Sequence, residues 1–97
     1  MLSISITDTG EVALIGRLDA SQTDAAGAVF DRLTVTTRVN FEKLEYISSA
    51  GLGLLLKTQK RLSQTGQGLI LTHMNKLVRD IFRIARFDLV FKIEEAP

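Results

Sequence analysis

Residues 46–53, Tyr-Ile-Ser-Ser-Ala-Gly-Leu-Gly, mark the place where the sequence changes from a strand pattern to a helix pattern. The β-branched run from Val35 to Phe41 precedes them and is typical of a buried central strand. Leucines at helical spacing follow them and predict a helix over about residues 50–63. A strand that passes directly into a helix predicts a βα unit of an α/β domain.

The first third of the chain predicts a hairpin followed by a helix. Apolar and polar residues alternate over residues 2–6, as in a half-buried strand, and residues 12–15 form a more fully buried one. The short Thr9-Gly10 turn between them favours antiparallel pairing. Ser21 and Asp24 have the spacing of a capping box, so a helix is expected to open at Ser21.

The last third predicts two further strands and a third helix. Residues 69–71 form a short buried strand, Asn75 is expected to cap the helix, and residues 89–93 form the last strand. The residues expected on the core face of this helix are Leu77, Val78, Ile81, Phe82 and Ala85. The predicted order β-β-α-β-α-β-α-β indicates a single α/β domain over residues 1–97. It would contain a mostly parallel mixed sheet with an N-terminal antiparallel hairpin and three main helices.

The composition excludes several kinds of site. With 97 residues the chain has room for one modest core, and the absence of cysteine excludes disulfides, cysteine-based zinc sites and cysteine nucleophiles. A formal net charge of +1 argues against a general nucleic-acid binder, which is usually strongly basic. The sequence shows neither a secretory signal nor an apolar stretch that would span a membrane. We therefore expect a soluble cytoplasmic domain with no metal, no cofactor and no membrane insertion.

The two serines at the strand–helix junction allow a structural and a functional interpretation. Ser48 or Ser49 is placed to cap the helix, the commonest role of serine at a helix start. The unpaired N–H groups and the dipole of a helix start also favour a phosphate, so a serine there can be phosphorylated without melting the helix. Ala50, Gly51 and Gly53 would leave the backbone open to a partner. Both interpretations stay open, because one serine can cap while the other is exposed.

Catalysis is the less favoured interpretation of the same junction. Ile47 occupies the first glycine position of the Gly-x-Ser-x-Gly nucleophile motif, and His73 is the only histidine that can serve as a base. A lone histidine at a strand end is far more often a surface or capping residue. We therefore expect no catalytic residues.

Charged residues mark two further places. Asp19 ends the turn after the second strand, where it would accept hydrogen bonds or place a fixed negative charge on the same face as the serines. Lys76, Arg79, Arg83 and Arg86 recur along the third helix. This basic face is interpreted first as a solvated face, and alternatively as a contact for an acidic partner or an anionic surface.

Three segments together resemble a known family. Gly16-x-Leu18-Asp19, then Val39-Asn40-Phe41, then residues 46–53 are similar in order and spacing to the STAS domain of anti-sigma factor antagonists, and the resemblance extends through Ile93. It implies partner switching. The unphosphorylated domain would bind an anti-sigma factor that is also a serine kinase, phosphorylation would release it, and a PP2C-type phosphatase would reverse the change.

Carried onto this chain, the resemblance makes Ser49 the phosphorylated residue, with Ser48 as the second candidate. The docking surface implied by the resemblance comprises Asp19, Ser48, Ser49, Ala50, Gly51 and Leu52. The chain departs from the family pattern Asp-Ser-[Ser/Thr]-Gly, because Ser48 stands in the place of the aspartate. Residues 94–96 look like the start of the family's C-terminal helix, which is expected to be absent or rudimentary.

The resemblance leaves a second class of function open. A STAS domain of this kind would also serve as a subunit that regulates another cytoplasmic target. Such a target would be a partner switch in secretion or signalling, or the ATPase of an ABC lipid transporter.

Overall fold

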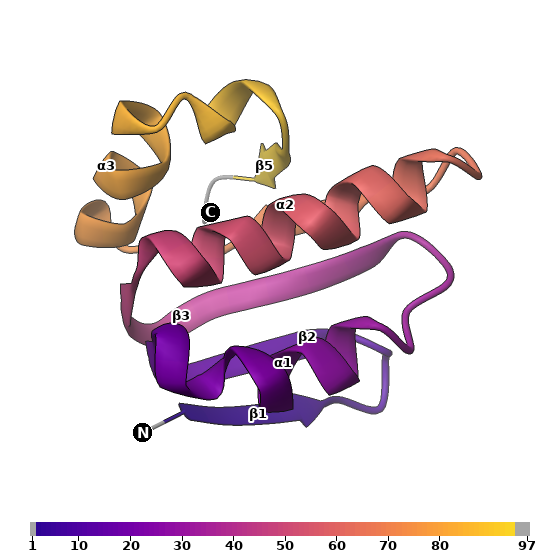
Figure 1. Ribbon diagram of the computed structural model, residues 1–97, viewed down its shortest axis with the longest axis horizontal. Coiled ribbons are helices and arrows are strands. Elements are labelled where there is room, and N and C mark those ends of the chain that lie inside the picture. Colours follow the sequence, from indigo (N-terminus) through magenta and orange to yellow (C-terminus); the bar gives the residue numbers. More distant parts are fainter. Residues whose placement is uncertain (1, 95–97) are drawn as a thin grey trace.

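The five strands of residues 2–94, which are the residues that the computed structural model describes, form one mixed sheet (Figure 1). Their order across the sheet follows the sequence, from β1 to β5. The strands are β1 (Leu2–Ile6), β2 (Val12–Leu18), β3 (Thr37–Ile47), β4 (Leu69–Thr72) and β5 (Lys92–Glu94). β1 pairs with β2 antiparallel, and the other three pairings are parallel. The predicted α/β architecture and its N-terminal hairpin are confirmed.

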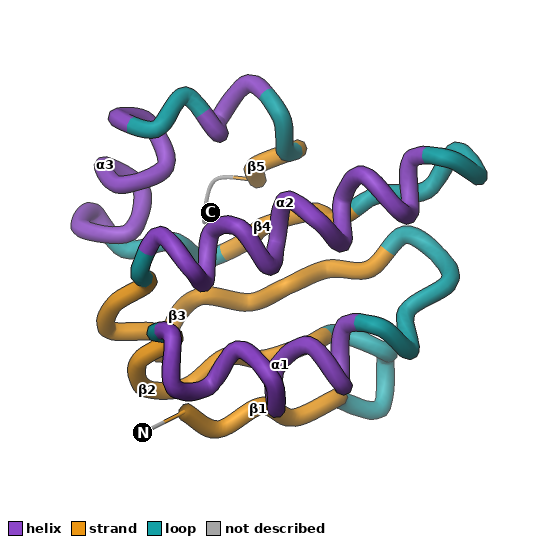
Figure 2. The backbone as a smooth tube through the Cα atoms, in the orientation of Figure 1, coloured by secondary structure: helices purple, strands orange, loops and turns teal. Residues whose placement is uncertain are grey.

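The three α-helices are α1 (Thr23–Phe30), α2 (Ser49–Ser63) and α3 (Lys76–Ile84). α1 and α2 lie beside each other across one face of the sheet, while α3 stands beyond the start of α2 (Figure 1). Phe82 of α3 packs edge-on against Phe41 of β3, with 5.9 Å between the ring centroids. Figure 2 shows that β3 runs almost directly into α2, through Ser48 alone. No helix among the described residues is long and apolar enough to cross a membrane.

The central strand is longer than its sequence pattern predicts. It covers Thr37–Ile47, whereas Val35 lies before it and is exposed. Buried residues alternate up to Phe41, but the next two, Leu44 and Ile47, are each three residues further on, because the pairing with β2 shifts register twice along this stretch. A β-bulge adds a residue and breaks the two-residue period, which is why the pattern is recognisable only to Phe41.

The C-terminal elements differ from the predicted strand over residues 89–93. A 3-10 turn (Phe87–Leu89) comes first, and β5 begins only at Lys92. Phe87 and Phe91 both pack on Phe82, at centroid distances of 6.4 and 5.8 Å, so aromatic packing holds a turn where the apolar run predicts a strand. Glu94, the first of the residues that resemble the start of a C-terminal helix, ends β5, and the other two lie among residues 95–97, outside the described residues.

Arg61 of α2 connects this helix to the end of α1. Its guanidinium donates hydrogen bonds to the carbonyl oxygens of Leu33, at 2.9 Å, and Phe30, at 2.8 Å. These carbonyls lie at and just beyond the end of α1, where backbone oxygens lack partners within the helix. Arg61 therefore ties the far end of α2 to the end of α1.

An Arg61→Met variant is expected to unfold with about 2 kcal/mol less free energy, because two carbonyls lose charge-assisted hydrogen bonds. Urea denaturation of the two proteins gives this difference directly. Lys60→Met is the matched control, since the exposed Lys60 lies on the same helix, and it should change the stability by less than about 0.5 kcal/mol. Equal losses in both variants would contradict the role assigned to Arg61.

Candidate functional site

The ends of β2 and β3 meet at one edge of the sheet. Leu18 is paired with Ile47, and the N–H of Ser48 donates to the carbonyl oxygen of Leu18 at 2.9 Å. Asp19 and Ser48, the next residue of each chain segment, therefore lie side by side. This is the juxtaposition that the sequence predicts for the turn aspartate and the serine junction.

The structure separates the roles of the two serines. Ser48 is the N-cap of α2, with extended backbone, and its Oγ accepts a hydrogen bond from the N–H of Gly51 at 3.2 Å. Ser49 is the first residue of the helix, and its side chain is exposed. The capping role thus belongs to Ser48, and the accessible hydroxyl at the helix start belongs to Ser49.

Gly51 has a structural role that the sequence does not reveal. A Cβ atom at this position would lie 2.8 Å from Cγ1 of Ile47 and 2.9 and 3.0 Å from Cγ and the carbonyl oxygen of Leu18. Gly51 is buried, so its backbone faces its own core and is not open to a partner as expected. Gly53 does fit that expectation, because it is exposed and a Cβ atom there would meet nothing within 4 Å.

Asp19 caps the 3-10 turn Ala20–Gln22 that precedes α1. Its Oδ1 accepts from the backbone N–H of Ser21 at 2.9 Å and from the Ser21 hydroxyl at 2.6 Å, while Gln22 Oε1 accepts from the Asp19 N–H at 3.0 Å. The capping box is therefore Asp19 with Gln22, and the predicted box of Ser21 with Asp24 is wrong because a 3-10 turn comes before the helix. The Ser21 hydrogen bonds hold the pKa of Asp19 below its ordinary value.

An apolar groove of about 330 Å³ lies beside Ser49, between the start of α2 and α3. Its lining residues are Tyr46, Ile47, Ser49, Leu52, Ile81, Ile84 and Ala85. None of these residues is charged, and Ile84 is 83% exposed. Ile84 is not among the residues predicted from the sequence, although an isoleucine next to Arg83 and off the predicted core face of α3 is a signal that can identify it.

Of the other predicted contact residues, Leu52 lines this groove and Ala50 does not. Leu52 is only 7% exposed and packs in the core at the floor of the groove. Ala50 is half-buried on the opposite side of α2, where it faces a more polar hollow of about 500 Å³ between α1 and α2. Asp24, Asp31 and Lys57 lie among the residues that line this second hollow. The start of α2 thus separates an apolar groove from a charged one.

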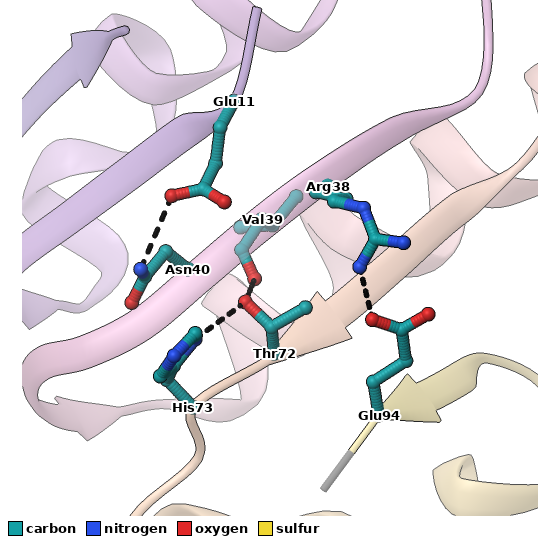
Figure 3. A network of polar contacts seen from close by, with 7 residues as sticks. All are labelled: Glu11, Arg38, Val39, Asn40, Thr72, His73 and Glu94. Carbon is teal, nitrogen blue, oxygen red and sulfur yellow. Dashed lines mark hydrogen bonds and ion pairs between the residues drawn. The ribbon is translucent and has the colours of Figure 1, made fainter. Parts of the chain in front are cut away.

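The register of the sheet separates His73 from the serines. β4 pairs with β3 only over Thr37–Asn40, so His73 follows its strand at the level of Asn40, whereas Ser49 follows the far end of β3. The Nδ1 atom of His73 lies 3.0 Å from the hydroxyl of Thr72 (Figure 3). The register therefore gives no support to a serine–histidine pair. The described residues also contain no group of three or more metal-ligating side chains.

Polar contacts connect β3 to other segments of the sheet near Arg38 and Asn40 (Figure 3). The amide of Asn40 donates to Glu11 at 3.1 Å, and Arg38 forms an ion pair with Glu94. The hydrogen bond from Arg38 lowers the pKa of Glu94 and raises that of Arg38. The first contact joins β3 to the residue before β2, and the second joins β3 to β5 across β4. Both contacts lie apart from the serine junction.

The family of the chain follows from comparison with known proteins. The family model described as "Mlab, STAS domain" matches residues 4–93, so the chain belongs to the STAS domain family. A Bordetella bronchiseptica protein described as an anti-sigma factor antagonist, BtrV, is 39% identical over 51 residues, which are 53% of this chain and 44% of BtrV. The matched segment thus spans less than half of this curated relative.

Solved structures share the fold at low sequence identity. The Thermotoga maritima protein TM1081 superposes with a TM-score of 0.80 at 22% identity, over 100% of this chain and 87% of that one. The anti-sigma factor antagonist SpoIIAA in its unphosphorylated form gives a TM-score of 0.70 at 21% identity, over 100% and 90% of the two chains. The phosphorylated Bacillus SpoIIAA gives 0.71 at 21% identity, over 100% and 92%.

Proposed function

We propose that this chain is an anti-sigma factor antagonist that works in the cytoplasm by partner switching, with Ser49 as its phosphorylated residue. The proposal rests on one observation at the start of α2: Ser48 caps the helix, whereas Ser49 has an exposed hydroxyl. The unphosphorylated form would bind an anti-sigma factor that is also a serine kinase. A PP2C-type phosphatase would restore this form after phosphorylation. The chain acts here as a kinase substrate and a binding partner, not as a catalyst.

The surroundings of Ser49 supply a physical mechanism for release. A phosphate adds about −1.5 to −2 charges at neutral pH, and Ser49 lines a groove that has no charged residue in its lining. Burying that phosphate under a partner would cost several kcal/mol, against the roughly 8 kcal/mol that hold a micromolar complex together. The helix itself tolerates the phosphate, because its N-terminal N–H groups and dipole favour negative charge. Phosphorylation therefore breaks the contact without unfolding α2.

Phosphorylation by the cognate kinase is expected on Ser49 alone. After incubation with the kinase and ATP, mass spectrometry of peptides should place the phosphate on Ser49 in the wild type and in a Ser48→Ala variant. A Ser49→Ala variant should stay unmodified. Phosphate on Ser48, or on neither serine, would contradict the proposal.

The groove is expected to hold an apolar side chain of the partner. An Ile84→Asp variant should therefore weaken partner binding more than about tenfold in isothermal titration calorimetry. The free energy of unfolding should change by less than about 0.5 kcal/mol, because Ile84 is 83% exposed. Leu89→Asp is the matched control, since Leu89 is 78% exposed and lies outside the groove lining. Equal loss of binding in both variants would rule out the groove as the contact.

A second candidate function is suggested by the departure at Ser48. The family pattern has an aspartate before the phosphorylated serine, and this chain has a capping serine there. A STAS subunit that regulates another cytoplasmic target, such as the ATPase of an ABC lipid transporter, would not need the acceptor. In that case the chain would copurify with an ATPase, and the Ser49→Ala variant would support the same activity as the wild type.

A further inference from the structure

The outer edge of β1 is an open strand edge. β1 is the first strand in the sheet order, and it pairs with β2 in unbroken register from Leu2 opposite Gly16 to Ile6 opposite Val12. No other strand of residues 2–94 pairs with its opposite side. Every second residue of such an edge presents a backbone N–H and C=O that can pair with another strand.

This edge lacks the features that usually prevent pairing between molecules. Edge strands are commonly protected by charged side chains, proline, bulges or very short length. The opposite edge of the sheet, β5, has such protection, because it is three residues long and carries Lys92 and Glu94. β1 has five residues, Leu-Ser-Ile-Ser-Ile, with no charge and no proline, and its pairing with β2 shows no register shift.

We propose that β1 pairs antiparallel with β1 of a second copy of the chain, about a twofold axis at Ile4. The sequence of the strand is self-complementary in that register, since Leu2 faces Ile6, Ile4 faces Ile4 and Ser3 faces Ser5. Apolar side chains then meet apolar side chains on the face that packs toward the core, and hydroxyls meet hydroxyls on the other face. Ile6, which is 53% exposed in one chain, would be covered by Leu2 of the second copy.

The surroundings of β1 allow this approach. α1 lies over the β1 side of the sheet (Figure 1). Asp24 and Asp31 of α1 line the hollow toward α2, which places Ala25 and Val29 on the other side of the helix, toward the joined edge. Both of these side chains are uncharged and no larger than valine. The twofold pairing puts the two copies of α1 on the same face of the joined sheet without bringing like charges of the two β1 strands together.

The expected dimer is weak and reversible. Pairing of two five-residue strands buries far less than the roughly 1,200 Å² of a stable protein interface. Because the pairing is antiparallel, the two Ser49 helix starts lie at opposite ends of the joined sheet, away from the contact. Dimerisation therefore does not depend on the function proposed for Ser49 and leaves that residue accessible.

Sedimentation equilibrium from micromolar to millimolar concentration tests the dimer. The wild type is compared with variants that carry charged residues in place of the exposed Ser3 and Ser5. The wild-type mass should rise from that of one 10.7 kDa chain toward twice that value. A Ser3→Lys/Ser5→Lys variant and a Ser3→Glu/Ser5→Glu variant should each stay monomeric, because like charges face each other, and an equimolar mixture should dimerise. A wild type that stays monomeric at millimolar concentration, or a doubly lysine-substituted variant that still dimerises, would overturn the proposal.

Disulfide trapping tests the register. The chain contains no cysteine, so an Ile4→Cys variant has a single thiol that faces its own copy across the twofold axis. This variant should form a covalent dimer under mild oxidation, because two residues directly opposite each other in paired strands are close enough for a disulfide. Ile15→Cys on β2 is the control, since Ile15 is 39% exposed but lies one strand away from the edge. Equally fast cross-linking of both variants would overturn the proposed register.

Discussion

A Ser49→Asp variant is expected to bind the proposed kinase partner at least about thirtyfold more weakly than the wild type, a loss of about 2 kcal/mol. The introduced carboxylate would lie at the rim of the apolar groove, where none of the lining residues carries a compensating positive charge. Covering it with a partner surface would remove its water without replacing it by a cation. Titration of purified kinase with each variant, by calorimetry or fluorescence anisotropy, gives the two dissociation constants.

Two control variants distinguish a docking effect from damage to the fold. Ser49→Ala should bind as the wild type does, because the exposed hydroxyl is not the cap of α2. Ser63→Asp carries the same charge at the exposed far end of α2 and should also bind normally. Ser49→Asp should unfold no more readily than the wild type, since an acidic residue in the first turn of a helix is favourable. Wild-type affinity of Ser49→Asp would contradict a docking surface centred on Ser49.

A Gly51→Ala variant is expected to unfold with about 1–3 kcal/mol less free energy, although alanine favours helices more than glycine does. The new methyl group would lie 2.8 Å from Ile47 and within 3.0 Å of the side chain and carbonyl oxygen of Leu18. The carbonyl is backbone and is itself bonded to the N–H of Ser48, so it cannot move aside cheaply. The start of α2 would have to lift from the strand ends. Urea denaturation measures the loss.

Gly53→Ala on the same helix is the matched control. A Cβ atom at Gly53 meets nothing within 4 Å, so only the gain in helix propensity remains. This variant is expected to be more stable than the wild type by about 0.5–1 kcal/mol. The two glycines, two residues apart, should thus respond with opposite signs. A stabilising Gly51→Ala substitution would show that α2 is not seated on the strand ends as described.

The predictable parts of the molecule are those in which local pattern and tertiary packing agree. The serine junction, the β1–β2 hairpin and the Asn75 cap are specified by residues close in sequence, and each was predicted. Asn75 caps α3 as expected, with its Oδ1 accepting from the N–H of Val78 at 2.8 Å. In such places a few neighbouring side chains determine the backbone.

The features that the sequence does not reveal depend on contacts between distant segments. Leu77 was predicted on the core face of α3 but is 55% exposed. Only one side of that helix packs on the sheet, where Phe82 contacts Phe41 of β3. The role of Gly51 depends on Leu18, which lies more than thirty residues earlier in the chain. Arg61 has the spacing of a solvated residue, and its partners on α1 become visible only once the two helices are placed side by side.

α2 is anchored at both of its ends, which limits how far a change at one end can alter the structure elsewhere in the domain. Gly51 seats its start on the strand ends, while Arg61 and Gln59 bond its far half to α1 and to the N–H of Leu69 on β4. A helix held in this way has little freedom to shift. A modification of its first residue would therefore change the surface around that residue without moving the rest of α2. A ligand of the β1 edge would not sense it. The pairing proposed for that edge and the phosphorylation proposed for Ser49 would then be two independent signals on one small domain.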